Sequence, residues 1–189
     1  MDPRLSRLLD RNEIEEVVLR YCRGIDRRDF DLVRSCYHPD ATDRHGSFDG
    51  GVDAYLAWVE RLTARYRFTM HFVGNVLVEF GPTPDVAACE TYGVALHRAD
   101  EPNPALNLAT GFRYLDRFER RDGVFRIAAR EAVGEWSMRL PPELWWEIPS
   151  SHETGRRDAS DALHRLLARV GVPTPSPTPA PAPASQEKP

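Results

Sequence analysis

The sequence contains almost no lysine, and it lacks a basic region of the kind that binds nucleic acid. Of its 25 basic residues only Lys188 is a lysine, and the arginines alternate with aspartates and glutamates along the chain. The formal net charge is −4 and the isoelectric point is near 5.9. Because nucleic-acid-binding proteins usually present a strongly basic face, the composition argues against nucleic acid as a partner.

Cysteines and long apolar runs are also scarce. Cys22, Cys36 and Cys89 are too few and too scattered for a disulfide framework or a zinc site. No run approaches the roughly 18 apolar residues of a membrane span. The first residues lead directly into a charged amphipathic segment without the apolar stretch of a signal peptide. These features predict a cytoplasmic protein that makes no contact with a membrane.

The motifs that bind common cofactors are missing. The chain has no glycine-rich phosphate loop, no dinucleotide fingerprint and no G-x-S-x-G elbow. His38, His45 and His97, with the carboxylates Asp40, Asp43 and Glu90, form no compact pair such as H-E-x-x-H. We therefore expect no metal and no cofactor.

Apolar residues in the first third of the chain recur at three- and four-residue steps, which is typical of helices. The pattern predicts helices over residues 5–24, 30–37 and 52–66. Gly24 suits a helix C-terminus because it tolerates left-handed backbone angles. Pro39 would close the second helix, and the third would follow the Gly50–Gly51 turn.

After Arg67 the apolar period changes to two, which is typical of strands. Strands are predicted over residues 68–80, broken by a bulge near Gly74, and over residues 85–98, 106–119 and 124–138. Asp122–Gly123 is a strong signal for a hairpin turn between the last two. Helices followed by a strongly bent antiparallel sheet predict an α+β fold.

The chain divides into three parts by composition. Residues 1–140 carry the helix and strand patterns, and residues 141–172 form a C-terminal extension with one short helix over 158–170. In residues 173–189, seven of the seventeen are proline, mixed with alanine, serine and threonine. We expect this tail to be disordered and to hold no site.

Four stretches together carry a family resemblance. They are Ile14 through Asp26, Tyr37-His38-Pro39-Asp40-Ala41, Met70 through Asn75, and Glu119 through Phe125. In this order they resemble the SnoaL-like branch of the nuclear transport factor 2-like superfamily, and most of all its scytalone dehydratases, bile-acid 7α-dehydratases and hexachlorocyclohexane dehydrochlorinases. The resemblance implies a cone-shaped fold in which the N-terminal helices pack on a bent sheet around a cavity.

The resemblance also implies a catalytic pair. An aspartate after the first helix and a histidine on the long first strand match Asp26 and His71 here. Asp26 would orient His71 and stabilise its imidazolium, and His71 would take a proton from a substrate carbon. Without the resemblance, Asp26 reads as a turn or N-cap residue and His71 as a histidine on a polar, solvent-facing strand surface.

Two further residues match active-site positions of the family. Tyr21 lies where the bile-acid dehydratases carry a tyrosine, and Arg130 lies where the dehydrochlorinases carry an arginine that can bind an anion. A core tyrosine and an exposed strand arginine remain open alternatives. The aromatic residues Tyr55, Trp58, Tyr92, Phe112 and Tyr114 are candidate substrate-binding walls of the cavity or ordinary core.

The leading hypothesis is a cofactor-independent lyase or isomerase for a small hydrophobic cyclic molecule. A non-catalytic partner, such as the small subunit of a ring-hydroxylating dioxygenase, and a small-molecule-binding protein are the alternatives, because one fold supports many functions. Phe68, Met70, Phe72, Val76 and Val78 would give the sheet an apolar outer face. This face predicts a homo-oligomer, and the resemblance favours a trimer over a dimer.

Overall fold

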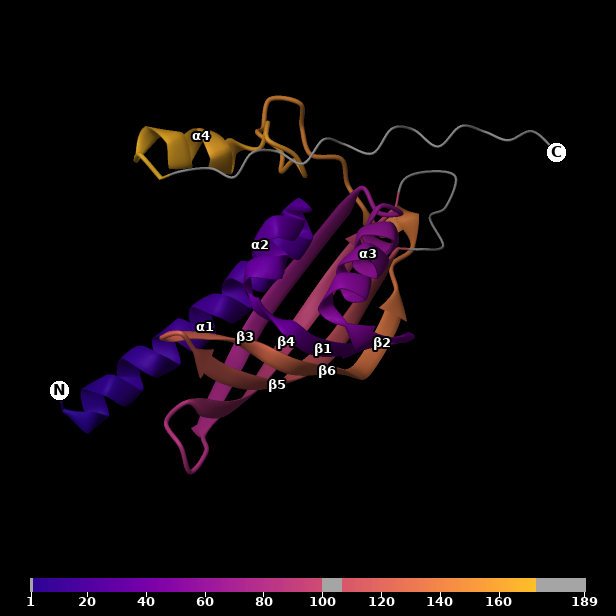
Figure 1. The fold of residues 1–189 in the computed structure, drawn as a ribbon. Helices are drawn as coiled ribbons and strands as arrows, with labels where there is room; N and C mark the ends of the chain where they lie inside the picture. Colours follow the sequence, from indigo (N-terminus) through magenta and orange to yellow (C-terminus); the bar gives the residue numbers. More distant parts are fainter. Residues whose placement is uncertain (1, 100–106, 173–189) are drawn as a thin grey trace.

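The computed structural model describes residues 2–99 and 107–172. Three helices precede most of the sheet, and a fourth helix follows it (Figure 1). The helices are α1 (Pro3–Arg27), α2 (Phe30–Ser35), α3 (Val52–Thr63) and α4 (Ala162–Arg169), with a short 3-10 turn at Pro142–Leu144. The strands are β1 (Tyr37–His45), β2 (Phe48–Gly51), β3 (Phe68–Phe80), β4 (Val86–Arg98), β5 (Leu108–Arg121) and β6 (Val124–Arg139).

The six strands form one sheet in the order β2-β1-β6-β5-β4-β3. Strands β3 to β6 make an antiparallel meander, whereas β1 runs parallel to β6 and antiparallel to β2. Helices α1, α2 and α3 lie on one face of this sheet (Figure 1). The predicted α+β class is confirmed, with a mixed sheet. None of the helices in the described ranges has both the length and the hydropathy needed to cross a bilayer.

Helix α1 is longer than the sequence predicts at both ends. Asp2 caps its first turn by accepting a hydrogen bond from the Arg4 amide at 2.8 Å. The predicted end at Gly24 is wrong, because the helix runs to Arg27 and Arg28 caps it with φ of 57°. Gly24 instead permits close packing, since a Cβ there would lie 2.7 Å from Val33 Cγ2. Asp26 consequently lies in the last helical turn and is buried.

Strands β1 and β2 were not predicted. Residues 37 and 39 were expected to end the second helix, but the helix stops at Ser35 and Tyr37 begins β1. The inward positions near the end of β1 include Asp43 and His45. Because these side chains are polar, the strand lacks the alternating apolar signal that marks a half-buried strand.

The hairpins of the meander agree with the prediction. Asp122 and Gly123 have φ of 52° and 81° in the turn between β5 and β6. Two residues with positive φ are typical of a type I′ hairpin turn, and Asp-Gly is a favoured pair for it. The register of β3 against β4 shifts between Val73 and Val76, which confirms the bulge near Gly74.

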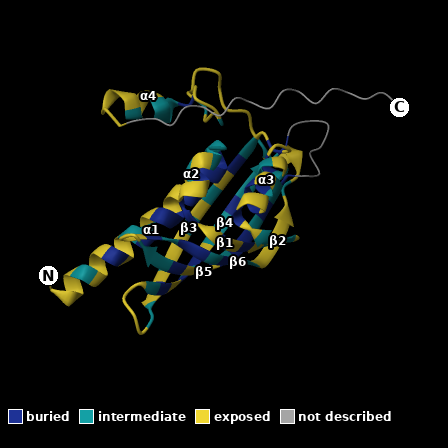
Figure 2. Cartoon of the chain, viewed as in Figure 1, coloured by how far each residue is buried: buried dark blue, intermediate teal, exposed yellow. Residues whose placement is uncertain are grey.

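The bulge reverses which side chains of β3 face the helices. Before it, Thr69 is fully buried whereas Phe72 is 73% exposed. After it, Val78 is buried and Leu77 is exposed. The prediction that Val76 and Val78 share the outer face with Met70 and Phe72 is therefore wrong, because both valines pack against the core. Figure 2 shows the alternation of buried and exposed residues along the strands.

The outer sheet face nonetheless exposes a set of large apolar side chains. Its members come from four neighbouring strands and are Met70, Phe72, Leu77, Tyr92, Leu115, Trp136 and Met138. Contiguous exposed apolar surface of this kind usually marks an interaction site. The homo-oligomer stays a prediction that rests on this face.

Candidate active site

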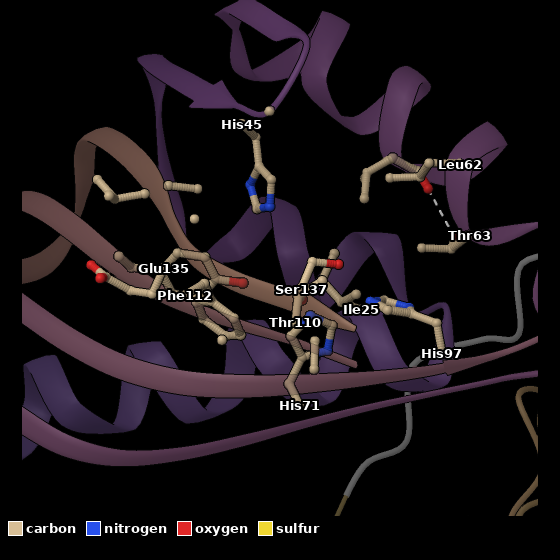
Figure 3. Close-up of a pocket in the computed structure, with 18 of the residues that line it drawn as sticks. Ile25, His45, Leu62, Thr63, His71, His97, Thr110, Phe112, Glu135 and Ser137 are labelled. Carbon is tan, nitrogen blue, oxygen red and sulfur yellow. Dashed lines mark hydrogen bonds between the residues drawn. The ribbon is translucent and has the colours of Figure 1, made fainter. Parts of the chain in front are cut away.

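A cavity of about 470 Å³ lies between the inner face of the sheet and helices α1 and α3. Its walls are mostly apolar and aromatic, with a few polar groups that converge on the interior (Figure 3). Such a composition is typical of small-molecule sites, which bury most of an apolar ligand and orient it with few polar contacts. The polar groups come from different elements: His45 from β1, His71 from β3, His97 from β4, Thr110 from β5 and Ser137 from β6.

His71 and Asp26 meet at the edge of this cavity. His71 Nδ1 lies 2.7 Å from Asp26 Oδ1, and the backbone amide of His71 donates to Asp26 Oδ2 at 2.9 Å. The side chains are only 8% and 10% exposed, respectively. Because an ionised carboxylate can only accept, Nδ1 carries the proton in this arrangement, and the lone pair of the neutral ring lies on Nε2. Figure 3 shows the imidazole of His71 pointing into the cavity.

The local structure explains why the two residues meet across 45 positions of sequence. Asp26 lies on the buried side of the last turn of α1, and His71 follows the buried Thr69 by two residues on the inner side of β3. Helix α1 packs directly on β3. The carboxylate is thus held by both the ring and the backbone of one residue, which fixes the orientation of the imidazole.

Tyr21 and Tyr55 form the floor of the cavity together with Tyr114. The hydroxyl groups of Tyr21 and Tyr55 are hydrogen-bonded to each other, and both residues line the cavity. Burial raises the pKa of Tyr21 and of Tyr55 well above the ordinary value of a phenol. Both groups therefore stay protonated at neutral pH and can donate or accept a hydrogen bond.

Arg130 lies beneath this floor and is absent from the cavity wall. It binds Asp116 through two hydrogen bonds, Nε to Oδ1 at 2.7 Å and Nη2 to Oδ2 at 2.6 Å, and both side chains are fully buried. Its guanidinium lies 4.0 Å from the ring centres of Tyr21 and Tyr114. The structure thus places Arg130 behind the aromatic floor, where it supports the tyrosines and does not face the cavity.

Four of the five aromatic residues predicted to bind substrate line the cavity: Tyr55, Trp58, Phe112 and Tyr114. Tyr92 lies elsewhere, on the outer sheet face, where it is 44% exposed. The inner positions of β4 are the small or polar residues Cys89, Thr91 and Ala95. Tyr92 therefore belongs to the more apolar side of β4, and that side faces away from the helices.

Two histidines of the cavity were considered in the sequence only as metal ligands. His45 Nδ1 lies 3.5 Å from Oδ1 of Asp43 without a hydrogen bond between them. Asp43 is fully buried, and its Oδ2 accepts a hydrogen bond from the Tyr37 hydroxyl at 2.6 Å. The ring of His97 lies 6.0 Å from that of His71. Within residues 2–99 and 107–172, no three histidine, cysteine or acidic side chains are grouped to hold a metal. The inward strand positions of these histidines become apparent only from the fold.

Burial, with a smaller contribution from the neighbouring His71, lowers the pKa of His97 to about 4. As the pH falls, the unfolded chain, whose histidine pKa is near 6.5, therefore binds this proton at a higher pH than the folded protein does. The His97 contribution to stability is present above pH 6.5 and is lost as the pH falls towards about 4, by up to about 3 kcal/mol. We expect His97→Gln to flatten the acid side of the melting-temperature profile.

The matched control is His152→Gln, since His152 is exposed in the C-terminal extension. Melting temperatures of the three proteins across the acid range would provide the measurement. Parallel profiles for the wild type and His97→Gln would contradict the assignment of this proton to His97.

Comparison with known families gives a match for most of this region. The model of the SnoaL-like domain matches residues 6–131, which include the dyad, the tyrosine floor and five of the six strands completely. The chain belongs to the SnoaL-like family. A search of curated proteins gave no match to this SnoaL-like chain.

Solved structures support the same fold. A hexachlorocyclohexane dehydrochlorinase, LinA-type3 from Novosphingobium barchaimii, superposes with a TM-score of 0.68 at 22% identity, over 76% of this chain and 99% of its own. A putative scytalone dehydratase from Novosphingobium aromaticivorans gives 0.65 at 19% identity, over 78% and 98%. A Mycobacterium tuberculosis protein of unknown function gives 0.60 at 21% identity, over 90% of each chain. At these identities the likeness shows the fold alone.

Proposed function

We propose that this SnoaL-like chain is a cofactor-independent lyase that removes water or hydrogen halide from a small, largely apolar cyclic molecule. The observation that carries the proposal is the Asp26–His71 hydrogen bond of 2.7 Å, which leaves His71 Nε2 as the ring nitrogen available to a ligand in the cavity. A base positioned in this way contributes typically about 10²–10⁴-fold to a proton transfer. The dehydrochlorinase and dehydratase names among the structural neighbours agree with this reaction class.

The first half of the reaction is the removal of a proton from carbon. His71 Nε2 takes the proton, and the electrons of the C–H bond become the new carbon–carbon double bond. Asp26 stabilises the imidazolium that forms, in the manner of carboxylate–histidine pairs in general. The apolar walls exclude water, which strengthens the interaction between these charges.

The second half is the departure of the leaving group. His45 points into the cavity from a different strand and a different side than His71 (Figure 3). As an imidazolium beside Asp43, it would donate its proton to a leaving hydroxyl, which departs as water. The bond from carbon to oxygen breaks as the double bond forms, and the two histidines end with exchanged protonation states. Solvent then restores both.

The test is a screen of hydroxylated and halogenated cyclic compounds in deuterated buffer with mass spectrometry. A lyase yields a product lighter by water or hydrogen halide, whereas an isomerase yields a product of unchanged composition that has gained deuterium. The Asp26→Asn protein is the control, because it keeps the shape of the dyad without the charge. Co-purification with a large partner subunit and no turnover of any compound would favour the non-catalytic alternative.

A further inference from the structure

A second cavity, of about 380 Å³, lies at the end of the sheet where the C-terminal extension crosses it. It shares no lining residue with the first cavity. Its wall combines the end of α1, the start of β3, the end of β4 and two stretches of the extension. The lining residues are Arg27, Arg67, Phe68, Thr69, Arg98, Trp145, Trp146, Glu147, Ile148, Thr154, Gly155 and Arg157.

Most of the charged residues that line this cavity are arginines. Four of its residues are arginines, and Glu147 is the single carboxylate among them. The side chain of Glu147 is 73% exposed and forms an ion pair with Arg98 at 2.9 Å, and Arg27 is paired with Asp161 at 3.4 Å. A concave surface lined by several arginines attracts anions, and guanidinium groups match the geometry of carboxylates and phosphates.

Three buried hydrogen-bond donors of the wall are left without an acceptor. They are Thr69 Oγ1, Trp145 Nε1 and Arg157 Nη2, and no acceptor within residues 2–99 and 107–172 satisfies them. Leaving a buried donor unsatisfied typically costs about 1–3 kcal/mol, so such groups call for an explanation. All three can donate, and two of the three cannot accept, which points to a ligand that supplies acceptors.

Arg157 is an arginine of this wall whose hydrogen bonds within the described residues involve no carboxylate. It donates Nε to the Asp26 carbonyl at 3.3 Å and Nη1 to the carbonyls of Thr63 and Tyr66 at 3.1 and 2.5 Å. These acceptors are neutral. Burial, together with the charge of Arg28, lowers the pKa of Arg157 to about 10, although the Asp26 carboxylate acts in the opposite direction. A largely buried cation whose hydrogen bonds in the described part of the chain go only to peptide carbonyls is stabilised further when an anion binds beside it.

Several apolar side chains line the rest of the wall. Trp145 lies beneath the guanidinium of Arg98, at 5.1 Å from its ring centre, and Phe68 and Ile148 complete the surface. An aromatic ring of a ligand can stack on such a surface while its charged end meets the arginines. The apolar and cationic parts of the wall therefore select a ligand that carries both features.

We propose that this second cavity binds a small organic oxyanion, a carboxylate or a phosphate monoester attached to a flat apolar group. The anion accepts hydrogen bonds from Thr69, Trp145 and Arg157, and the apolar group lies against Trp145 and Phe68. The three donor atoms are almost inaccessible to solvent in the free protein, so the wall rearranges locally when the anion binds.

The test uses isothermal titration of the full-length protein with phenyl phosphate, benzoate, inorganic phosphate and neutral benzyl alcohol. We expect one molecule of an aromatic anion to bind per chain, with an affinity that falls at high salt. Tighter binding of phenyl phosphate assigns the site to phosphate esters, and tighter binding of benzoate assigns it to carboxylates. Benzyl alcohol binding as well as the anions, or no aromatic anion binding at millimolar concentration, would overturn the proposal.

Two variants separate binding from folding. Thr69→Val and Trp145→Phe each remove a donor that has no partner in the free protein. Because no hydrogen bond is lost, the melting temperature of each variant should stay close to that of the wild type. Each should weaken binding of the preferred anion by about tenfold or more, because hydrogen bonds to charged groups are strong. Thr42→Val, on an exposed position of β1, is the matched control and should leave affinity unchanged. Unchanged affinity in both donor variants would contradict the site.

Discussion

Replacement of His71 by alanine is expected to lower kcat/KM by about 10²–10⁴-fold once a substrate is in hand, because it removes the proton acceptor outright. The chain should still fold, since His71 lies at the edge of a cavity where a smaller side chain leaves more room for water. Steady-state kinetics on the first compound turned over in the screen would give the measurement, and circular dichroism would confirm the fold.

Asp26→Asn should produce a loss of similar size through a different route. The amide cannot stabilise the imidazolium, and it can turn its NH₂ group towards Nδ1 and so favour the wrong tautomer. Because the two residues act as one unit, the double variant should be slowed no more than the slower single variant. Effects that multiply in the double variant would mean that the dyad is structural.

Matched controls for these variants exist in the chain. Asp49 is exposed on β2 and His152 is exposed in the extension, and neither lines the cavity. Asp49→Asn and His152→Ala should therefore keep the activity of the wild type. A comparable loss in either control would indicate that the assay reports general damage to the protein.

The largest expected effect on stability comes from the ion pair beneath the cavity floor. Arg130→Met leaves the Asp116 carboxylate buried and unpaired, and breaking a fully buried pair in this way costs about 3–5 kcal/mol. Arg130 also packs between the rings of Tyr21 and Tyr114, so these contacts are altered as well. Denaturant unfolding would give the free energy of unfolding.

Two comparisons make this prediction specific. The double variant Arg130→Met with Asp116→Leu removes both charges and should recover much of the loss, because no unpaired charge remains. Arg20→Met removes an exposed ion pair, in which the side chains of Arg20 and Glu16 are 57% and 50% exposed. This substitution should lower the free energy of unfolding by about 1 kcal/mol or less. Equal losses for Arg130→Met and Arg20→Met would contradict the role assigned to the buried pair.

The sequence predicted the parts of the fold in which local pattern and burial agree. The helices, the four-strand meander, the Asp122–Gly123 turn and the bulge near Gly74 were all expected, and the structure has them. The effect of that bulge was missed, because uninterrupted alternation along the strand would place Val76 and Val78 on the same face as Met70. One extra residue at a bulge moves every later side chain to the other face.

The site was predictable only in part, for a related reason. Asp26 and His71 were expected from the family resemblance, and their contact could not follow from spacing alone. His45 and His97 were missed as cavity residues because cavity-facing strand positions here are polar, and polar side chains usually indicate solvent. Tyr92 was placed in the cavity by the opposite error, since an aromatic residue on a strand usually indicates the core.

The position of Arg157 bears on how far this protein can be truncated. The carbonyls that it binds belong to the last turn of α1, to the last residue of α3 and to Tyr66 just after it. Helix C-termini leave carbonyls without partners inside the helix. One side chain of the extension thus donates hydrogen bonds to carbonyls at the C-terminal ends of two helices in the family domain. A fragment trimmed to residues 6–131 would lose this support and also the last half of β6. The match to the family model therefore ends before the elements that complete the sheet and support these helix ends.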